Sequence, residues 1–147
     1  MERYGKMTAE PKPARKKLKI ILDSNALFVP LQFNIDLFED LKKLLNRNFE
    51  LVMLSPTRLE LERIATQGSA SMRKNAAFAL KLAERCEPLD IGQRTGASTD
   101  DLIVQAAAKY KYPVFTNDRR LRNRLRDINV PVIYVRQKSR LEIDGRL

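Results

Sequence analysis

Short apolar runs alternate with longer amphipathic segments along this chain. Residues 18–22 and 49–54 are almost continuously apolar, which is typical of strands buried on both faces of a parallel sheet. Between them, residues 36–46 place leucine and phenylalanine at helical spacing and end at an asparagine, a pattern that predicts an amphipathic helix. The first third of the chain therefore predicts a strand, a helix and a second strand.

The same alternation continues to residue 135. After a Ser-Pro-Thr interruption at 55–57, the pattern predicts helices at 58–66, 71–85, 99–109 and 119–127 and strands at 88–91, 113–116 and 130–135. The buried side of the second of these helices is expected to hold Met72, Ala76, Ala79, Leu80 and Ala83. Alternating strands and helices with short connections predict an α/β fold, a three-layer α/β/α sandwich with a central parallel sheet.

Residues 1–17 differ from the rest of the chain. They hold two prolines, several basic residues and few apolar ones, so we expect a flexible basic arm ahead of one folded domain at 18–147. This segment lacks the apolar middle of a secretion signal, and no apolar run is long enough to cross a bilayer. These features favour a cytoplasmic protein.

The chain carries a large positive charge. Its 28 Lys and Arg residues against 18 Asp and Glu residues give a formal net charge of +10, which favours nucleic acid as a partner. There is no histidine, which excludes a histidine general base, a histidine-bearing zinc site and Ser-His-Asp chemistry. The single cysteine, Cys86, lies near alanines and leucines at helical spacing and is expected to fill the core.

Four acidic residues follow the predicted strands. Asp23 and Asp118 come directly after the first and fourth strands, and Glu60 and Asp100 lie in the first turns of the helices that follow the second and third. Because the carboxyl ends of parallel strands share one rim of the sheet, these side chains are expected to converge there. Each alone has an ordinary explanation as a turn or helix-capping residue. Together they would repel by about 4 kcal/mol for a pair 4 Å apart under surface-like screening, so their convergence indicates a bound cation.

A site made only of carboxylates favours Mg²⁺ or Mn²⁺, because these ions prefer oxygen ligands. One or two such ions can lower the pKa of a water, orient it toward a phosphodiester and neutralise charge on the leaving oxygen. Neighbouring polar side chains are expected to hold the acids or their waters by hydrogen bonds, namely Asn25, Thr99, Thr116 and Asn117.

At two of the four acid positions, a neighbouring acid could be the site residue instead. Glu62 competes with Glu60, but two helical positions lie about 200° apart around the axis, so only one of the pair can face the site. Glu60 is preferred because it is nearer the strand end. Asp101 similarly competes with Asp100 and could instead assist a second ion.

The segment after Asp118 holds five arginines in eight residues. Some of these side chains are expected to guide nucleic-acid phosphates toward the acids, and others to form a solvated helix face with pairs such as Arg124 and Asp127. The basic residues expected to bind nucleic acid are Arg119, Arg120, Arg122, Lys16 and Lys17. Tyr4, Tyr110 and Tyr112 are candidates for base stacking, with ordinary packing as the alternative.

Four sequence motifs resemble those of the PIN-domain ribonucleases. They are LDSN, PTRLELERI, STDDLIVQAA and TNDRRL, which occur in this order between Lys19 and Val135. The resemblance implies a divalent-metal-dependent endoribonuclease in which Asp23, Glu60, Asp100 and Asp118 are the catalytic and metal-binding acids. The final part, from TNDRRL through VIYVRQKSRLEI, looks like the PIN proteins of the archaeal and eukaryotic ribosomal RNA machinery, including the small-subunit processome.

Three functional hypotheses follow from this resemblance. The first is an endoribonuclease that cuts a structured ribosomal RNA precursor. The second is a toxin-type ribonuclease of a toxin-antitoxin pair, held inactive by an antitoxin-like inhibitor protein. The third is a non-catalytic PIN scaffold that binds RNA. The 71–85 segment is apolar over a wide part of its surface, which favours deep burial, with a homodimer contact as the alternative.

Overall fold

One sheet organises the chain in the computed structural model, which describes residues 17–92 and 96–147. Within these residues the strand order is β3-β2-β1-β4-β5-β6. The first five strands are parallel, and β6 is antiparallel to β5. The strands are β1 (Leu18–Leu22), β2 (Phe49–Leu54), β3 (Glu87–Leu89), β4 (Val114–Phe115), β5 (Val132–Arg136) and β6 (Arg140–Asp144).

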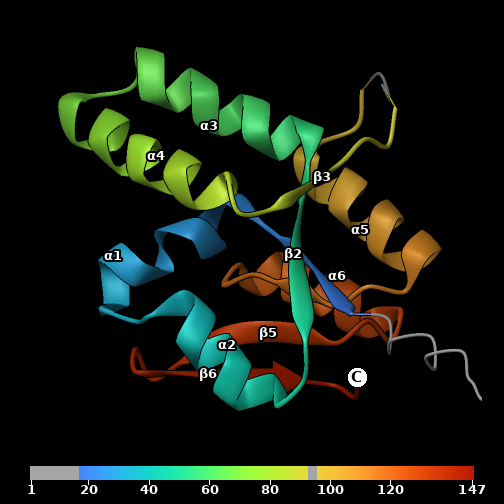
Figure 1. The fold of residues 1–147 in the computed structure, drawn as a ribbon. Coiled ribbons are helices and arrows are strands. Elements are labelled where there is room, and N and C mark those ends of the chain that lie inside the picture. The colour runs from blue at the N-terminus through green and yellow to red at the C-terminus, as the bar shows by residue number, and fades with distance from the viewer. Residues whose placement is uncertain (1–16, 93–95) are drawn as a thin grey trace, which may run out of the picture.

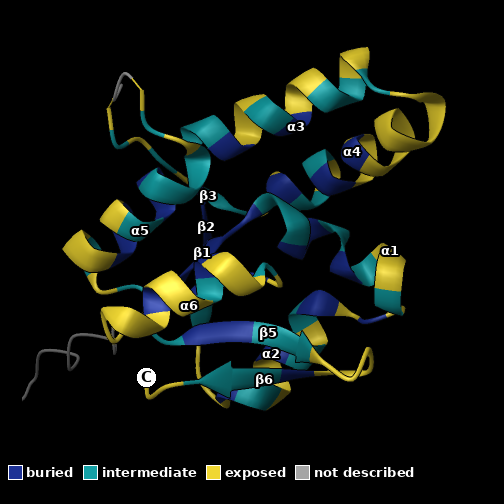
Figure 2. Ribbon diagram, turned by 180° about the vertical axis from the view of Figure 1, so that it is seen from behind, coloured by how far each residue is buried: buried dark blue, intermediate teal, exposed yellow. Residues whose placement is uncertain are grey.

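Helices cover both faces of this sheet, so the predicted three-layer α/β/α architecture is confirmed. One face carries η1 (Ser24–Phe28), α1 (Val29–Phe33), α2 (Leu37–Leu45) and α4 (Ala70–Ala83), with α3 (Ser55–Gln67) beside α4. The other face carries α5 (Thr99–Tyr110) and α6 (Arg119–Asp127). Figure 1 shows α2 in front of the sheet and α6 behind it. Figure 2 shows the buried sides of α5 and α6 turned toward the strands.

The core follows from strand alternation. Ile20 and Leu22 pack on the α2 and α4 side, whereas Ile21 packs on the α5 and α6 side, and all three are fully buried. In β4, Phe115 packs on the α2 and α4 side and Val114 packs on the α5 and α6 side. The next residue after each strand, Asp23 or Thr116, therefore turns toward α5 and α6.

The topology fixes where a site can form. The chain moves outward from β1 to β2 and β3, and then returns to add β4 on the other side of β1. Between two strands whose connections leave in opposite directions, the helices diverge and leave a crevice at the carboxyl ends. The strand order therefore predicts that this crevice lies at the carboxyl ends of β1 and β4.

Some sequence-based boundaries were wrong. The helix expected at 58–66 begins at Ser55, because Pro56 suits the first helical turn, where its missing N–H costs nothing. Glu60 consequently lies in the second turn rather than the first. Met72 is half exposed instead of buried, since the buried stripe of α4 is formed by Ala76, Ala79 and Ala83.

Three elements were not predicted at all. The short η1 and α1 follow Asp23. Their sequences contain a proline and a mixture of polar and apolar residues, so they show no helical spacing of apolar positions. Strand β6 follows a tight turn at Gln137 and Lys138, whose φ angles are 53° and 58°. The described helices include none that is both long enough and apolar enough to cross a membrane.

Candidate active site

Asp23 lies at the crevice between β1 and β4, and its residue surface is only 5% exposed. Its Oδ1 accepts a hydrogen bond from the Ser24 backbone N–H at 2.7 Å, and its Oδ2 accepts one from the Thr116 hydroxyl at 2.7 Å. Burial nevertheless raises the pKa of Asp23 above its usual value, although these two hydrogen bonds oppose the rise. The carboxylate is thus firmly positioned but poorly solvated.

A network of side chains fixes the loop that follows β4. The Thr116 hydroxyl accepts from the Asp118 N–H at 3.0 Å while donating to Asp23. Asn25 Oδ1 accepts from the Asn117 N–H at 3.0 Å, and Asn117 Oδ1 accepts from the Val135 N–H at 2.8 Å. Three of the four residues expected to support the acids are therefore in place. The fourth, Thr99, opens α5 and makes no side-chain hydrogen bond within the described residues.

Asp118 is the N-cap of α6. Its Oδ1 accepts hydrogen bonds from the backbone N–H groups of Arg120 at 2.8 Å and Leu121 at 3.3 Å. Its Oδ2 has no hydrogen-bond partner among the residues that the structure describes. One oxygen of Asp118 thus stabilises the helix, and the other is free for a ligand.

Asp100, in the first turn of α5, faces the same crevice. Burial raises the pKa of Asp100, and the negative charge of Asp118 raises it further, while Arg124 and Arg120 lower it. The charges of Asp100 and Asp118 also raise the pKa of Asp23. Three of the four predicted acids, which stand after β1, at the start of α5 and after β4, therefore lie near enough to affect one another's ionisation.

Asp101 has a different environment from Asp100. It forms a capping box with Ser98, in which its Oδ2 accepts from the Ser98 N–H at 3.2 Å and its own N–H donates to the Ser98 hydroxyl at 3.1 Å. Its Oδ1 pairs with Arg124 at 2.9 Å, in place of the expected Arg124 to Asp127 pair. These hydrogen bonds lower the pKa of Asp101. Both of its oxygens are engaged, which favours Asp100 as the site residue.

Glu60 and Glu62 lie on different sides of α3. Glu62 is exposed and pairs with Arg58, with 3.5 Å between Oε2 and Nε. Glu60 is half-buried, lies beside the buried stripe of Thr57 and Leu61, and makes no ion pair with any described residue. This difference favours Glu60 as the fourth acid.

If Glu60 is a metal ligand, as the sequence predicts, then replacing it with glutamine is expected to lower cleavage of RNA by about 100-fold, because that ligand would be lost. The matched change Glu62→Gln removes the same charge from an exposed ion pair and is expected to alter the rate by less than about twofold. Steady-state cleavage of one RNA by both variants makes the comparison. A larger loss for Glu62→Gln would reverse the assignment.

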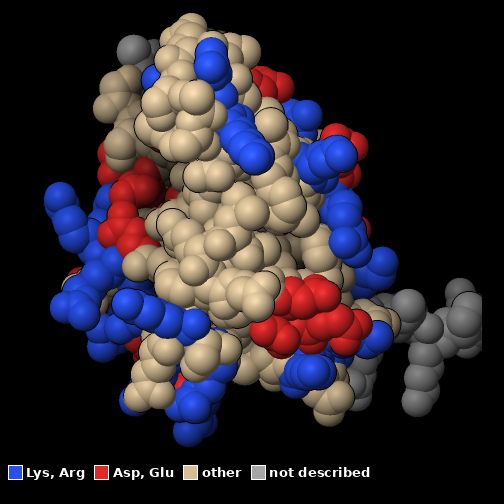
Figure 3. Space-filling model, turned by 90° about the vertical axis from the view of Figure 1, so that its left-hand side faces the viewer, with Lys and Arg blue, Asp and Glu red and all other residues tan. Residues whose placement is uncertain are grey.

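The arginines of α6 divide into free and engaged side chains. Arg119 and Arg120 are exposed. Arg122 instead packs its guanidinium over the ring of Tyr134, 4.1 Å from the centroid, and Arg126 Nε lies 3.6 Å from Asp144 Oδ2. Figure 3 shows acidic side chains in separate areas of one face, and one of these areas is bordered by many Lys and Arg side chains.

Other predicted RNA contacts lie away from the acids. Lys17 precedes β1 and Asp23 follows it, so the length of the strand, about 20 Å, separates Lys17 from Asp23 at the opposite rim of the sheet. Tyr110 and Tyr112 stack on each other there, with ring centroids 5.4 Å apart, and share a cavity with Lys17. Lys16, Tyr4 and the rest of the expected basic arm fall outside the described residues.

Comparison with known proteins shows the family of the chain. A family model described as a PIN like domain matches residues 20–138. The chain belongs to the PIN-like domain family. This PIN domain is 32% identical to Ribonuclease VapC4 of Methanocaldococcus jannaschii, over 86% of the chain and 97% of that protein. The fold class and the resemblance expected from the sequence are thus confirmed.

Two further relatives are an rRNA-processing protein and a PIN domain endonuclease. It is 33% identical to the rRNA-processing protein fcf1 of Schizosaccharomyces pombe, over 84% of the chain and 62% of that protein. The solved structure of the PIN domain endonuclease Utp24 superimposes with a TM-score of 0.73 at 31% identity, over 88% of this chain and 92% of that one. The relatives therefore include one protein named as a ribonuclease and one named for rRNA processing.

The acids of this PIN domain suit a divalent cation in their chemistry. PIN-domain nucleases generally use divalent metal ions, and carboxylate oxygens are the donors that Mg²⁺ and Mn²⁺ prefer. A cation would relieve the burial and repulsion that raise the pKa values of Asp23 and Asp100. No three acidic or cysteine side chains within residues 17–92 and 96–147 are already close enough to hold an ion.

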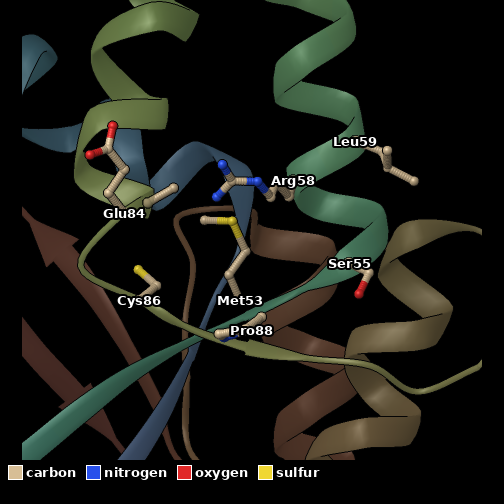
Figure 4. A pocket seen from close by; sticks show the side chains of 8 residues that line it. Met53, Ser55, Arg58, Leu59, Glu84, Cys86 and Pro88 are labelled. Atoms are coloured by element: carbon tan, nitrogen blue, oxygen red, sulfur yellow. The ribbon is translucent and has the colours of Figure 1, made fainter.

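A second hollow in this PIN domain is chemically unlike the acid crevice. The cavity of about 460 Å³ in Figure 4 lies between α3 and the end of α4, and its lining includes Met53, Leu59, Cys86 and Pro88. Burial raises the pKa of the Cys86 thiol to about 11, so the thiol stays protonated at neutral pH. Cys86 packs against the main core, as expected from the sequence. Met53 points to the α4 side of the sheet, away from the acids.

Proposed function

We propose that this PIN domain is a divalent-metal-dependent endoribonuclease that hydrolyses phosphodiester bonds in a ribosomal RNA precursor. The observation that carries the proposal is the grouping of Asp23, Asp100 and Asp118 at the crevice between β1 and β4, where burial and mutual repulsion raise the pKa values of two of them. Such a grouping costs free energy unless a cation binds. Mg²⁺ or Mn²⁺ is the cation that an all-oxygen site selects.

Each residue of the site has its own role in the proposed reaction. Asp23, Asp100 and the free oxygen of Asp118 would hold the ion, with Glu60 as a fourth ligand. The chemistry that such an ion would supply when bound is the acidification of a water and the neutralisation of charge on the leaving oxygen. Thr116 fixes the orientation of Asp23 through its 2.7 Å hydrogen bond and ties Asp118 to the same point. Arg119 and Arg120 hold the RNA backbone beside the acids.

Two relatives support a ribosomal substrate, namely fcf1 and Utp24, which are 33% and 31% identical to this chain. The alternative is a toxin-type ribonuclease, and it is favoured by the match to almost the full length of Ribonuclease VapC4. VapC ribonucleases pair with VapB antitoxins, so this alternative implies a small inhibitor protein as partner. The complete set of acids argues against a non-catalytic scaffold.

The proposal is tested by incubating the full chain with ribosomal RNA precursor transcripts and with transfer RNAs, in the presence of Mn²⁺ or EDTA. We expect Mn²⁺-dependent internal cuts in the precursor and none in EDTA. Sequencing of RNA crosslinked to the protein in its native cell then identifies the substrate. Enrichment of a few transfer or messenger RNAs, together with a co-purified inhibitor, would support the toxin alternative instead.

A further inference from the structure

The turn between β5 and β6 lies at the same rim as the acids. Phe115 of β4 is in register with Ile133 of β5, so Asn117 is level with Val135, and the 2.8 Å hydrogen bond between these two residues confirms this alignment. Strand β5 extends one residue further, to Arg136, before the chain turns at Gln137. The hairpin therefore projects from the rim immediately beside Asp118.

Basic side chains of this hairpin share the face on which the acids lie. Val132 packs with α5 and α6, and side chains two residues apart share a face of a strand, so Tyr134 and Arg136 point the same way. The stacking of Arg122 of α6 on Tyr134 agrees with this orientation. Arg140 is the direct cross-strand partner of Arg136 and therefore points to the same face.

Arg119 joins these side chains from α6. Residues 119, 122 and 126 fall on one side of a helix. Arg126 pairs with Asp144 at the far end of the hairpin, and Arg122 stacks on Tyr134 in its middle. One turn further toward the start of α6, Arg119 is therefore level with the hairpin tip. We call Arg119, Arg136, Lys138 and Arg140 the hairpin cluster.

The hairpin cluster is only partly neutralised. Glu142 is the carboxylate that pairs with it among the described residues, at 3.3 Å from Arg136 Nη1 and 2.9 Å from Arg140 Nε. Asp144 is engaged by Arg122 and Arg126 instead. The side chains of Arg136 and Arg140 remain 51% and 58% exposed, so about half of each side chain's surface is open to solvent. The hairpin cluster therefore has four positively charged side chains and one paired carboxylate, Glu142.

We propose that the hairpin cluster is a binding site for RNA backbone phosphates next to the bond that is cut. This inference rests on the proposed ribonuclease function and deepens it by assigning the path of the substrate. Guanidinium groups bind phosphate through paired N–H donors, and Glu142 holds two of them in place while the substrate is absent. Contacts of this kind position the RNA without reading its sequence. The RNA then crosses the β5–β6 hairpin and not the α3–α4 pair.

The test compares three variants in steady-state cleavage at several salt concentrations. Arg136→Gln with Arg140→Gln is expected to raise KM about tenfold with kcat changed less than about twofold, because the contacts lie away from the reacting bond. The dependence of log KM on log salt should become shallower by about 1.4, the value for two lost contacts to single-stranded RNA. Glu142→Gln should lower KM severalfold, because it frees both guanidinium groups.

The matched control is Arg63→Gln with Arg73→Gln, which removes the same charge from exposed positions on α3 and α4. Its KM should stay within about twofold of the unmodified protein if location matters more than net charge. Equal KM increases for the two double variants, or a raised KM for Glu142→Gln, would overturn the inference while leaving the nuclease intact. Failure of the unmodified protein to cut or bind any RNA would instead overturn the proposed function.

Discussion

Asp23→Asn is expected to lower metal-dependent cleavage by about 1,000-fold, because loss of a central ligand removes several kcal/mol of charge stabilisation from the transition state. The fold should persist. The asparagine oxygen can accept from the Ser24 N–H, and its amide can donate to the Thr116 oxygen. The Thr116 hydroxyl can then turn to Asn25 Oδ1, which lies 3.5 Å away.

The same variant should melt at a higher temperature than the unmodified protein when no metal is present. Burial raises the pKa of Asp23 in the folded state, so its ionised form destabilises the fold at neutral pH. Asparagine removes that penalty. The advantage should be full above the raised pKa and should fade as pH falls toward the unfolded value of about 3.9, because Asp23 becomes protonated in the folded protein.

Thermal melts in EDTA across a pH series, together with cleavage assays in Mn²⁺, measure both effects. Asp36→Asn is the matched control, since Asp36 caps α2 on an exposed surface and holds no proposed ligand role. Normal cleavage by Asp23→Asn would remove this residue from the active site. A lower melting temperature at neutral pH would show that its carboxylate stabilises the fold after all.

Two adjacent acids are expected to respond in opposite ways. Asp100→Asn should lower kcat by about 1,000-fold and should leave the metal-free protein at least as stable, because the pKa of Asp100 is raised. Asp101→Asn should keep kcat within about threefold, because the exposed ion pair with Arg124 contributes little to the site. It should lower the melting temperature at neutral pH, because the pKa of Asp101 is lowered by bonds that stabilise its ionised form.

Rates and melts of the two variants decide between these roles. The stability that Asp101 contributes should be lost as pH falls through its lowered pKa, so the melting difference should shrink in acid. Asp100 is the wrong assignment if Asp101→Asn is the slower enzyme. Equal losses from both changes would indicate that both carboxylates bind ions.

Much of the fold was predictable because the core strands β1 and β2 are almost continuously apolar in sequence. The bounds of β1, β2 and α6 match the sequence pattern. The grouping of Asp23, Asp100 and Asp118 also followed from the sequence, because parallel topology alone brings strand ends to one rim. Local pattern and chain direction were sufficient for these features.

Features that depend on contacts between elements were not predictable in this way. The pairing of Arg124 with Asp101 joins two helices whose spacing the sequence does not encode. Strand β6 could have been found from the alternation of polar and apolar residues at 140–144, but the turn before it contains no glycine to mark it. Missing β6 also hid the basic hairpin beside the acids.

The central claim is that separate carboxylates form one cation site in the crevice between β1 and β4. Anomalous diffraction from crystals soaked in Mn²⁺ tests it most directly. We expect a peak bounded by Asp23, Asp100 and Asp118, with oxygen ligands at about 2.1 to 2.3 Å, and its loss in crystals of Asp118→Asn. Crystals of the unmodified protein with no manganese between these side chains, or with manganese bound only elsewhere, would contradict the account.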